Sequence, residues 1–150
     1  MTSITVYDGN TTIGVTKIYV EENGSGVFLD FGTNFTEHDK YFNKFLRLRQ
    51  SRGIHDYIEM DFLPRIYNYR KDLIPSNYTV SGFKKLDVKA VLISHMHMDH
   101  FGDAGFFDKD LPVVASPITL ALLKGMQDMY SGRVGSEIIY YTERALNGLT

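Results

Sequence analysis

Three histidines and one aspartate follow directly on an apolar run, and this combination constrains the fold more than any other feature of the chain. The run Val88–Ser94 is nearly continuous in apolar residues and has the length of one strand. Such a run suits a strand that is covered on both faces. His95, His97, Asp99 and His100 come immediately after it. We therefore expect a cluster of ionisable side chains at the carboxyl end of a buried strand, where α/β folds commonly place sites.

The spacing of these four side chains predicts a metal site. His95 and His97 are two residues apart, so in an extended segment both imidazoles leave on one side and can meet one ion. Asp99 and His100 follow, where a turn into a helix would aim them at a second ion. The chain has no cysteine, so the ligands must be imidazole, carboxylate or water, and zinc, manganese and iron all remain open. A purely structural cluster is the alternative.

Other ionisable residues carry less weight. His38 and His55 flank an expected helix, where capping, packing or exposure explains them, and we interpret both as structural. Further carboxylates lie downstream of the cluster at Asp103, Asp108, Asp110 and Asp128. Sequence signatures of a phosphate-binding loop, a nucleophile elbow and a dinucleotide site are absent from the chain.

The order of the expected elements indicates a mixed α/β or α+β domain that spans residues 1–150 without an internal boundary. An antiparallel meander is expected first, and strands alternating with helices follow. The expected strands are 3–7, 12–21, 27–30, 88–94, 112–115 and 137–142. One helix is expected at 36–52, where Gly53 would end it. A second is expected at 118–130, preceded by Pro117 in the first helical position. Pro64 and Pro75 interrupt residues 54–80, which stay unassigned.

Charge is unevenly placed along the chain. The net charge is -2, which argues against a generally basic nucleic-acid binder. Basic residues nevertheless outnumber acidic ones from Lys40 to Lys71, and aromatic residues are interleaved with them. This segment could follow a phosphate backbone and stack bases. A solvated helix face with a buried aromatic stripe is the alternative.

The sequence predicts a cytoplasmic protein without membrane insertion. No apolar run approaches the ~20 residues of a membrane helix. The first residues lack the basic start and apolar stretch of a signal peptide.

The cluster resembles the signature of the metallo-β-lactamase superfamily, His-x-His-x-Asp-His, which His95, His97, Asp99 and His100 satisfy, with Gly102 in the usual continuation. The earlier run Phe28–Gly32 resembles the strand that precedes the active site in this superfamily. Four further segments are similar to ribonuclease J-like hydrolases: Tyr41–Leu46, Asp61–Pro64, Tyr69–Leu73 and Tyr140–Glu143.

The resemblance implies an αββα sandwich and a metal-dependent hydrolase with two divalent ions, zinc in the first place and manganese or iron as alternatives. It implies that His95 and His97 bind one ion and that Asp99 and His100 bind the other. A metal-bound hydroxide would attack the substrate, and Asp99 would orient that water as a catalytic residue. Asp30 would support the metal loop.

The chain departs from this pattern downstream, because no histidine follows His100. The resemblance implies further ligands there and more residues than 150. We therefore expect the N-terminal half of a single metallo-β-lactamase-like domain, which could be inactive for want of those ligands. An uncovered sheet face and strand edge in such a part would favour homo-oligomers.

Three functions follow as hypotheses. The first is hydrolysis of phosphodiester bonds in RNA, with the segment from Lys40 to Lys71 holding the substrate. The second is hydrolysis of a thioester, a lactone or a similar small substrate. The third is a noncatalytic metal-binding fragment.

Overall fold

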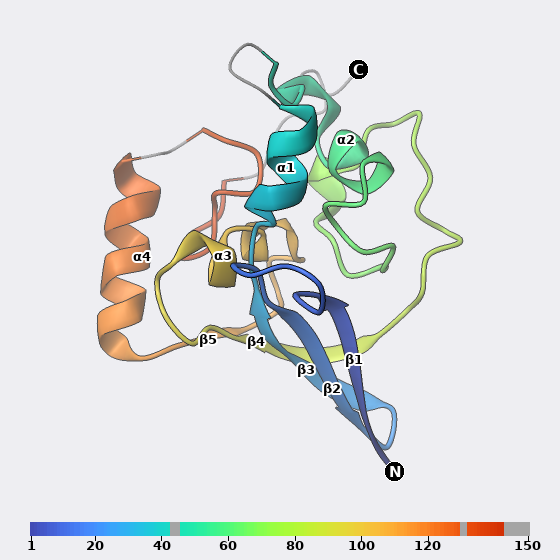
Figure 1. Cartoon of the computed structure of the whole chain (residues 1–150), viewed down its shortest axis with the longest axis vertical. Helices are drawn as coiled ribbons and strands as arrows, with labels where there is room; N and C mark the ends of the chain where they lie inside the picture. The colour runs from blue at the N-terminus through green and yellow to red at the C-terminus, as the bar shows by residue number, and fades with distance from the viewer. Residues whose placement is uncertain (43–45, 130–131, 143–150) are drawn as a thin grey trace.

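The fold is built on one five-stranded sheet in a computed structural model that describes residues 1–42, 46–129 and 132–142 (Figure 1). The strands lie in the order β1-β2-β3-β4-β5. β1, β2 and β3 pair antiparallel, whereas β4 runs parallel to both β3 and β5. Their bounds are β1 Thr2–Asp8, β2 Lys17–Glu22, β3 Ser25–Phe31, β4 Asp87–Leu92 and β5 Val113–Val114. An early meander followed by parallel strands confirms the predicted mixed α/β class.

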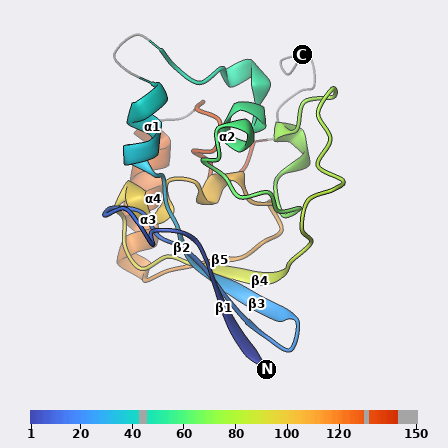
Figure 2. The same cartoon turned by 45° about the vertical axis from the view of Figure 1, so that its right-hand side comes forward.

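The helices lie to one side of this sheet, as Figures 1 and 2 show from two directions. They are α1 Phe35–Tyr41, α2 His55–Glu59, α3 Met98–Phe101 and α4 Pro117–Met129. One sheet with helices on one side corresponds to one half of an αββα sandwich. None of the helices in the described part of the chain is long and apolar enough to cross a membrane.

The sheet face toward the helices is aromatic and buried. Tyr19, Phe28 and Val91 are register partners on adjacent strands, so their side chains share this face. All three are at most 1% exposed. The Phe28 ring lies 5.1 Å from Phe31 and 5.3 Å from Phe107, measured between ring centroids. This aromatic cluster is part of the buried core on the helix side of the sheet.

The opposite sheet face is aliphatic and open. Register pairing aligns one row across all five strands: Val6, Ile18, Leu29, Leu92 and Val114. Leu92 is 37% exposed and Val114 is 50% exposed. The expectation that the strand at residues 88–94 is covered on both faces is therefore wrong for the described residues, because their helices pack on one side alone. The self-association predicted from such a face stays a prediction.

The first helix is much shorter than the predicted helix 36–52. α1 begins after Asn34, whose side-chain oxygen accepts from the amide of Glu37, and it ends at Tyr41. Residues 46–49 have no helical structure. The prediction is wrong there because Leu48 is buried by tertiary packing rather than by a helix face. Gly53, the expected stop, ends only a single 3₁₀ turn.

Two predicted strands also need correction. The strand expected at 12–21 begins only at Lys17, because Gly14 has φ +88 and bends the chain before it. Residues 137–142 form no strand. The amides of Ile138 and Ile139 both donate to the side-chain oxygen of Gln127, so a side chain takes the place of a strand partner.

The later elements follow the sequence more closely. α4 starts at Pro117 as predicted, and the Ser116 hydroxyl accepts from the amide of Thr119 in its first turn. Tyr130, the predicted last residue of this helix, lies outside the described residues. The strand expected at 112–115 is present as the two-residue β5.

Candidate metal centre

The candidate site lies at the carboxyl end of β4, where the chain leaves the sheet and turns into α3. His97 is the N-cap residue of this four-residue helix. His95 and His97 therefore precede the helix, whereas Asp99 and His100 belong to its first turn. The local order of an extended segment followed by a helical turn is the one that the spacing predicts.

The structure brings the three imidazoles of this loop together. Nε2 of His95 lies 3.1 Å from Nδ1 of His97. The rings of His95 and His100 are 4.1 Å apart between centroids. Nε2 of His100 lies 3.5 Å from a carboxylate oxygen of Asp99. All four predicted residues thus form one contiguous, partly exposed cluster, and their role as ligands stays a prediction.

Asp30 ties this cluster to the sheet. It lies near the end of β3 with φ +58, a left-handed conformation that is rare for residues other than glycine. Its carboxylate accepts from the backbone amide of Ser94 at 2.7 Å and from the Ser94 hydroxyl at 2.8 Å. It also lies 2.8 Å from Nδ1 of His100. These are the contacts that a residue supporting the loop would make.

A glycine lets the end of β3 approach the loop closely. A Cβ added to Gly32 would lie 1.7 Å from the carbonyl oxygen of Asp99. Two backbone hydrogen bonds link the segments at the same place. The amide of Thr16 donates to the carbonyl of Asp99, and the amide of Thr33 donates to the carbonyl of Met98. The strand end and the loop that carries His95, His97, Asp99 and His100 are therefore held together by backbone contacts that require a glycine at position 32.

The donor chemistry of the cluster fits a divalent transition-metal ion. Imidazole nitrogens and a carboxylate are the ligands that zinc takes where thiolates are absent. Among the described residues, however, no three histidine, aspartate or glutamate side chains are arranged to hold an ion together. The imidazoles contact one another instead. The residues thus fit a metal in chemistry and in place, and binding would require their side chains to turn toward a shared point.

A buried lysine beneath the loop was not found by sequence reasoning. Lys17 is 1% exposed, and its Nζ lies 2.9 Å from a carboxylate oxygen of Asp103. Asp103 also accepts from the Thr33 hydroxyl at 2.8 Å. Burial raises the pKa of Asp103, whereas the charge of Lys17 opposes that rise. Asp103 is therefore a structural residue at the end of α3. Nothing in the sequence around Lys17, at the start of β2, predicts that it pairs with Asp103.

The remaining downstream carboxylates make local contacts. Asp128 pairs with Lys124 one turn earlier on α4 and accepts from the Tyr140 hydroxyl. Asp108 accepts from the amide of Asp110. These contacts are typical of helix surfaces and turns.

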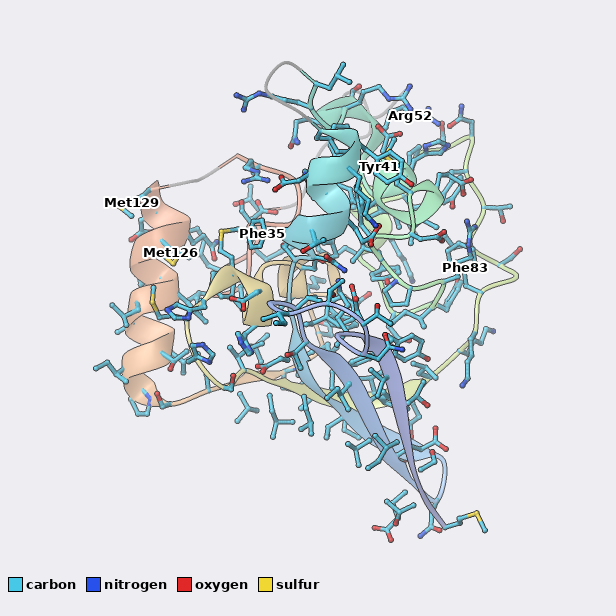
Figure 3. All side chains as sticks on the ribbon, viewed as in Figure 1. Phe35, Tyr41, Arg52, Phe83, Met126 and Met129 are labelled. Atoms are coloured by element: carbon cyan, nitrogen blue, oxygen red, sulfur yellow. The ribbon has the colours of Figure 1, made fainter. Side chains whose placement is uncertain are left out.

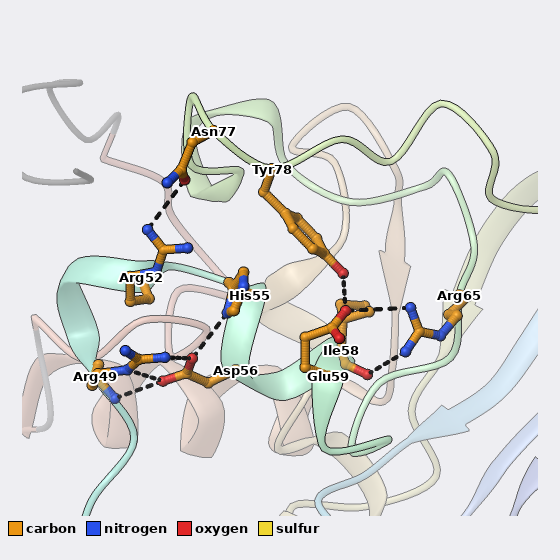
Figure 4. Close-up of polar contacts among 9 residues, drawn as sticks. All are labelled: Arg49, Arg52, His55, Asp56, Ile58, Glu59, Arg65, Asn77 and Tyr78. Atoms are coloured by element: carbon orange, nitrogen blue, oxygen red, sulfur yellow. Dashed lines mark hydrogen bonds and ion pairs between the residues drawn. The ribbon is translucent and has the colours of Figure 1, made fainter.

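The two histidines outside the loop are engaged in packing and pairing. His38 stacks on Phe62 with 5.0 Å between ring centroids, and burial lowers its pKa. His55 contacts the carboxylate of Asp56 and the ring of Tyr78. Figure 4 shows His55 and Asp56 together with Arg49 on the same carboxylate. These contacts agree with the structural interpretation of both histidines.

Most described cations of the Lys40–Lys71 segment are engaged in ion pairs. Arg49 binds Asp56, and Arg65 binds Glu59 (Figure 4). Lys40 pairs with Glu37. Arg70 is the most buried of these cations, at 2% exposure, and it pairs with Asp72 and Glu137. Glu37, Asp72 and Glu137 lie outside the segment, so the net charge of its surface is less positive than its own sequence indicates.

Comparison with known proteins places the chain in a family. The family model described as the metallo-beta-lactamase superfamily matches residues 63–139, just over half of the chain. A crystal structure described as a protein of unknown function from Enterococcus faecalis V583 is similar, with a TM-score of 0.60 and 27% identity. The similarity covers 83% of this chain but 28% of that one, so the chain spans less than a third of the length of this relative. No curated protein matches the chain. The chain belongs to the metallo-beta-lactamase superfamily.

Proposed function

We propose that this chain carries the metal-binding part of a hydrolase that cleaves phosphodiester bonds in RNA. Membership of the superfamily supports the coarser class, a metal-dependent hydrolase. One observation carries the proposal: the signature side chains gather at the carboxyl end of β4, and Asp30 braces the last of them from the neighbouring strand.

In the proposed site, His95 and His97 hold one divalent ion, and Asp99 and His100 hold a second; zinc is the first candidate, with manganese and iron as alternatives. Bound ions supply two things, water of lowered pKa and positive charge for the oxygens of the reacting group. Asp30 holds Nδ1 of His100, which leaves Nε2 on the side of Asp99. Asp99 orients the attacking water through its carboxylate.

The choice of RNA rests on the flanking sequence and on exposed cations. The sequence resemblance of four flanking segments to ribonuclease J-like hydrolases motivates this choice, whereas the family match supports the superfamily alone. Arg47 and Lys71 are exposed, and Arg52 donates to the neutral side chain of Asn77. Cations that are not consumed by carboxylates can contact phosphates.

Hydrolysis of a labelled single-stranded RNA, measured after chelation and again after addition of Zn²⁺ or Mn²⁺, tests this function. We expect cleavage that requires the added ion and is lost in Asp99→Asn. Asp128→Asn is the matched control, because its carboxylate pairs with Lys124 on the exposed side of α4. RNA turnover that survives complete metal removal would contradict the proposal.

A small acyl substrate, such as a thioester or a lactone, is the second candidate. The observation that favours it is the ion pairing of Arg49, Arg65 and Arg70, which weakens the attraction of this surface for a polyanion. The salt dependence of substrate binding separates the two, because each phosphate contact with a single strand contributes about -0.7 to the slope of log K against log salt. A slope near zero would favour the small substrate.

A further inference from the structure

A mostly apolar pocket lies between α1, α3 and α4, and none of the four candidate metal ligands is among its lining residues. Its volume is about 240 Å³. Met98 and Phe101 line it, whereas Asp99 and His100, the two residues between them, belong to the cluster described above. Met98 and Phe101 are three residues apart and so share a helix face. The pocket is therefore a separate site that shares one short helix with the metal loop.

The walls of this pocket come from several elements. Phe35 begins α1, Phe106 follows α3, and Leu123 and Met126 lie on α4. Leu123 and Phe106 are at most 2% exposed, so the floor is a formed part of the core. Figure 3 labels Phe35 and Met126, which belong to two of these walls. Apolar walls of this kind bind the hydrocarbon part of a ligand.

Polar side chains make up a minority of the lining, and several of them are already engaged elsewhere. Arg133 is exposed and lines the pocket, as do the imidazole of His38 and the phenol of Tyr57. The buried carboxylate of Asp103 is already engaged by Lys17 and Thr33. The side-chain oxygen of Gln127 accepts from two backbone amides, and the Ser136 hydroxyl donates to the carbonyl of Arg133. The group that remains to orient a ligand is thus a guanidinium, with a phenol and an imidazole on the same lining, which suits an anionic oxygen.

We propose that this pocket binds a small, mostly apolar acid, with its hydrocarbon part between Met98, Phe101 and Met126 and its carboxylate at Arg133. The volume lies below the ~300–1,000 Å³ typical of drug-sized ligands, which favours a short chain or a single ring. The proposal does not depend on the metal centre, since binding at Arg133 uses none of its ligands.

Isothermal titration of the 150-residue chain with octanoate tests the proposal, with octan-1-ol as the uncharged probe. We expect one site per chain for octanoate. Arg133→Gln should weaken octanoate binding about tenfold, the loss expected for one hydrogen bond to a charged group, and should leave octanol binding unchanged. Arg47→Gln is the matched control, an exposed arginine outside the pocket.

A second pair of variants tests the position of the hydrocarbon part. Met126→Trp should abolish binding of both probes because the indole fills the pocket. Met129→Trp, one turn further along the same helix and 71% exposed, should bind like the wild type (Figure 3). Thermal unfolding confirms that each variant is folded. The absence of octanoate binding to the wild type, or equal binding by wild type, Arg133→Gln and Met126→Trp, would overturn the proposal, the latter by locating the probe elsewhere, such as the open sheet face.

Discussion

The loop after β4 and the segment Lys40–Lys71 both concentrate ionisable side chains, yet they organise them in opposite ways. In the loop, three imidazoles contact one another, with 3.1 Å between Nε2 of His95 and Nδ1 of His97, and two carboxylates contact one imidazole, that of His100. In the segment, cations are paired with carboxylates, in part from distant positions such as Glu137. Grouping of metal-binding donors points to a ligand, whereas pairing of opposite charges points to stability. The two regions therefore call for different variants and different measurements.

The largest effect on stability is expected at the buried end of the basic segment. Arg70→Met should lower the free energy of unfolding by about 3–5 kcal/mol, because Asp72 and Glu137 lose the cation that they surround. Chemical denaturation of the variant measures the loss. Arg47→Met, at an exposed position, should change stability by less than about 0.5 kcal/mol. Equal losses of stability in the two variants would contradict the claim that the ion pairs of Arg70 stabilise the fold.

The support of the loop by Asp30 is expected to have the next largest effect. Asp30→Asn should weaken zinc binding by about 10–100-fold, since partners that orient a ligating histidine contribute on that scale. Competition with a chromogenic chelator measures the affinity. Asp56→Asn removes a carboxylate that also contacts a histidine, but in the basic segment, and should leave zinc affinity unchanged. A zinc affinity that is insensitive to Asp30→Asn would count against the proposed role of this residue.

A smaller effect is expected in the pH dependence of stability. The hydrogen bond from Arg49 lowers the pKa of Asp56 to about 2. A carboxyl whose pKa is lowered by folding stabilises the protein above its unfolded pKa of about 3.9, and this contribution is lost as pH falls through about 2. Thermal midpoints between pH 5 and pH 2 should therefore fall more steeply for the wild type than for Asp56→Asn. Parallel profiles would show that this pair contributes nothing.

Features that depend on neighbouring residues could be predicted from the sequence. The strand before the loop, the helical turn at Asp99 and His100, and α4 with Pro117 as its first residue are all set by local pattern. Superfamily membership follows from a signature contained within a few residues.

Features that depend on distant residues could not be predicted. The pairing of Lys17 with Asp103 and of Arg70 with Glu137 joins positions far apart in the chain. The apolar residue Leu48 suggested a helix face, but tertiary packing buries it. Residues 137–142 had the composition of a strand, yet Gln127 satisfies the amides of two of them. Propensity loses to tertiary contacts in each case.

The central claim is that the histidine loop, unlike His55 of the basic segment, holds metal. Elemental analysis of the purified chain after gel filtration, for wild type, His97→Ala and His55→Ala, tests it most directly. We expect bound zinc, manganese or iron in the wild type and in His55→Ala, and its loss in His97→Ala. Metal content that is the same in all three proteins, or absent from the wild type after incubation with zinc, would contradict the account.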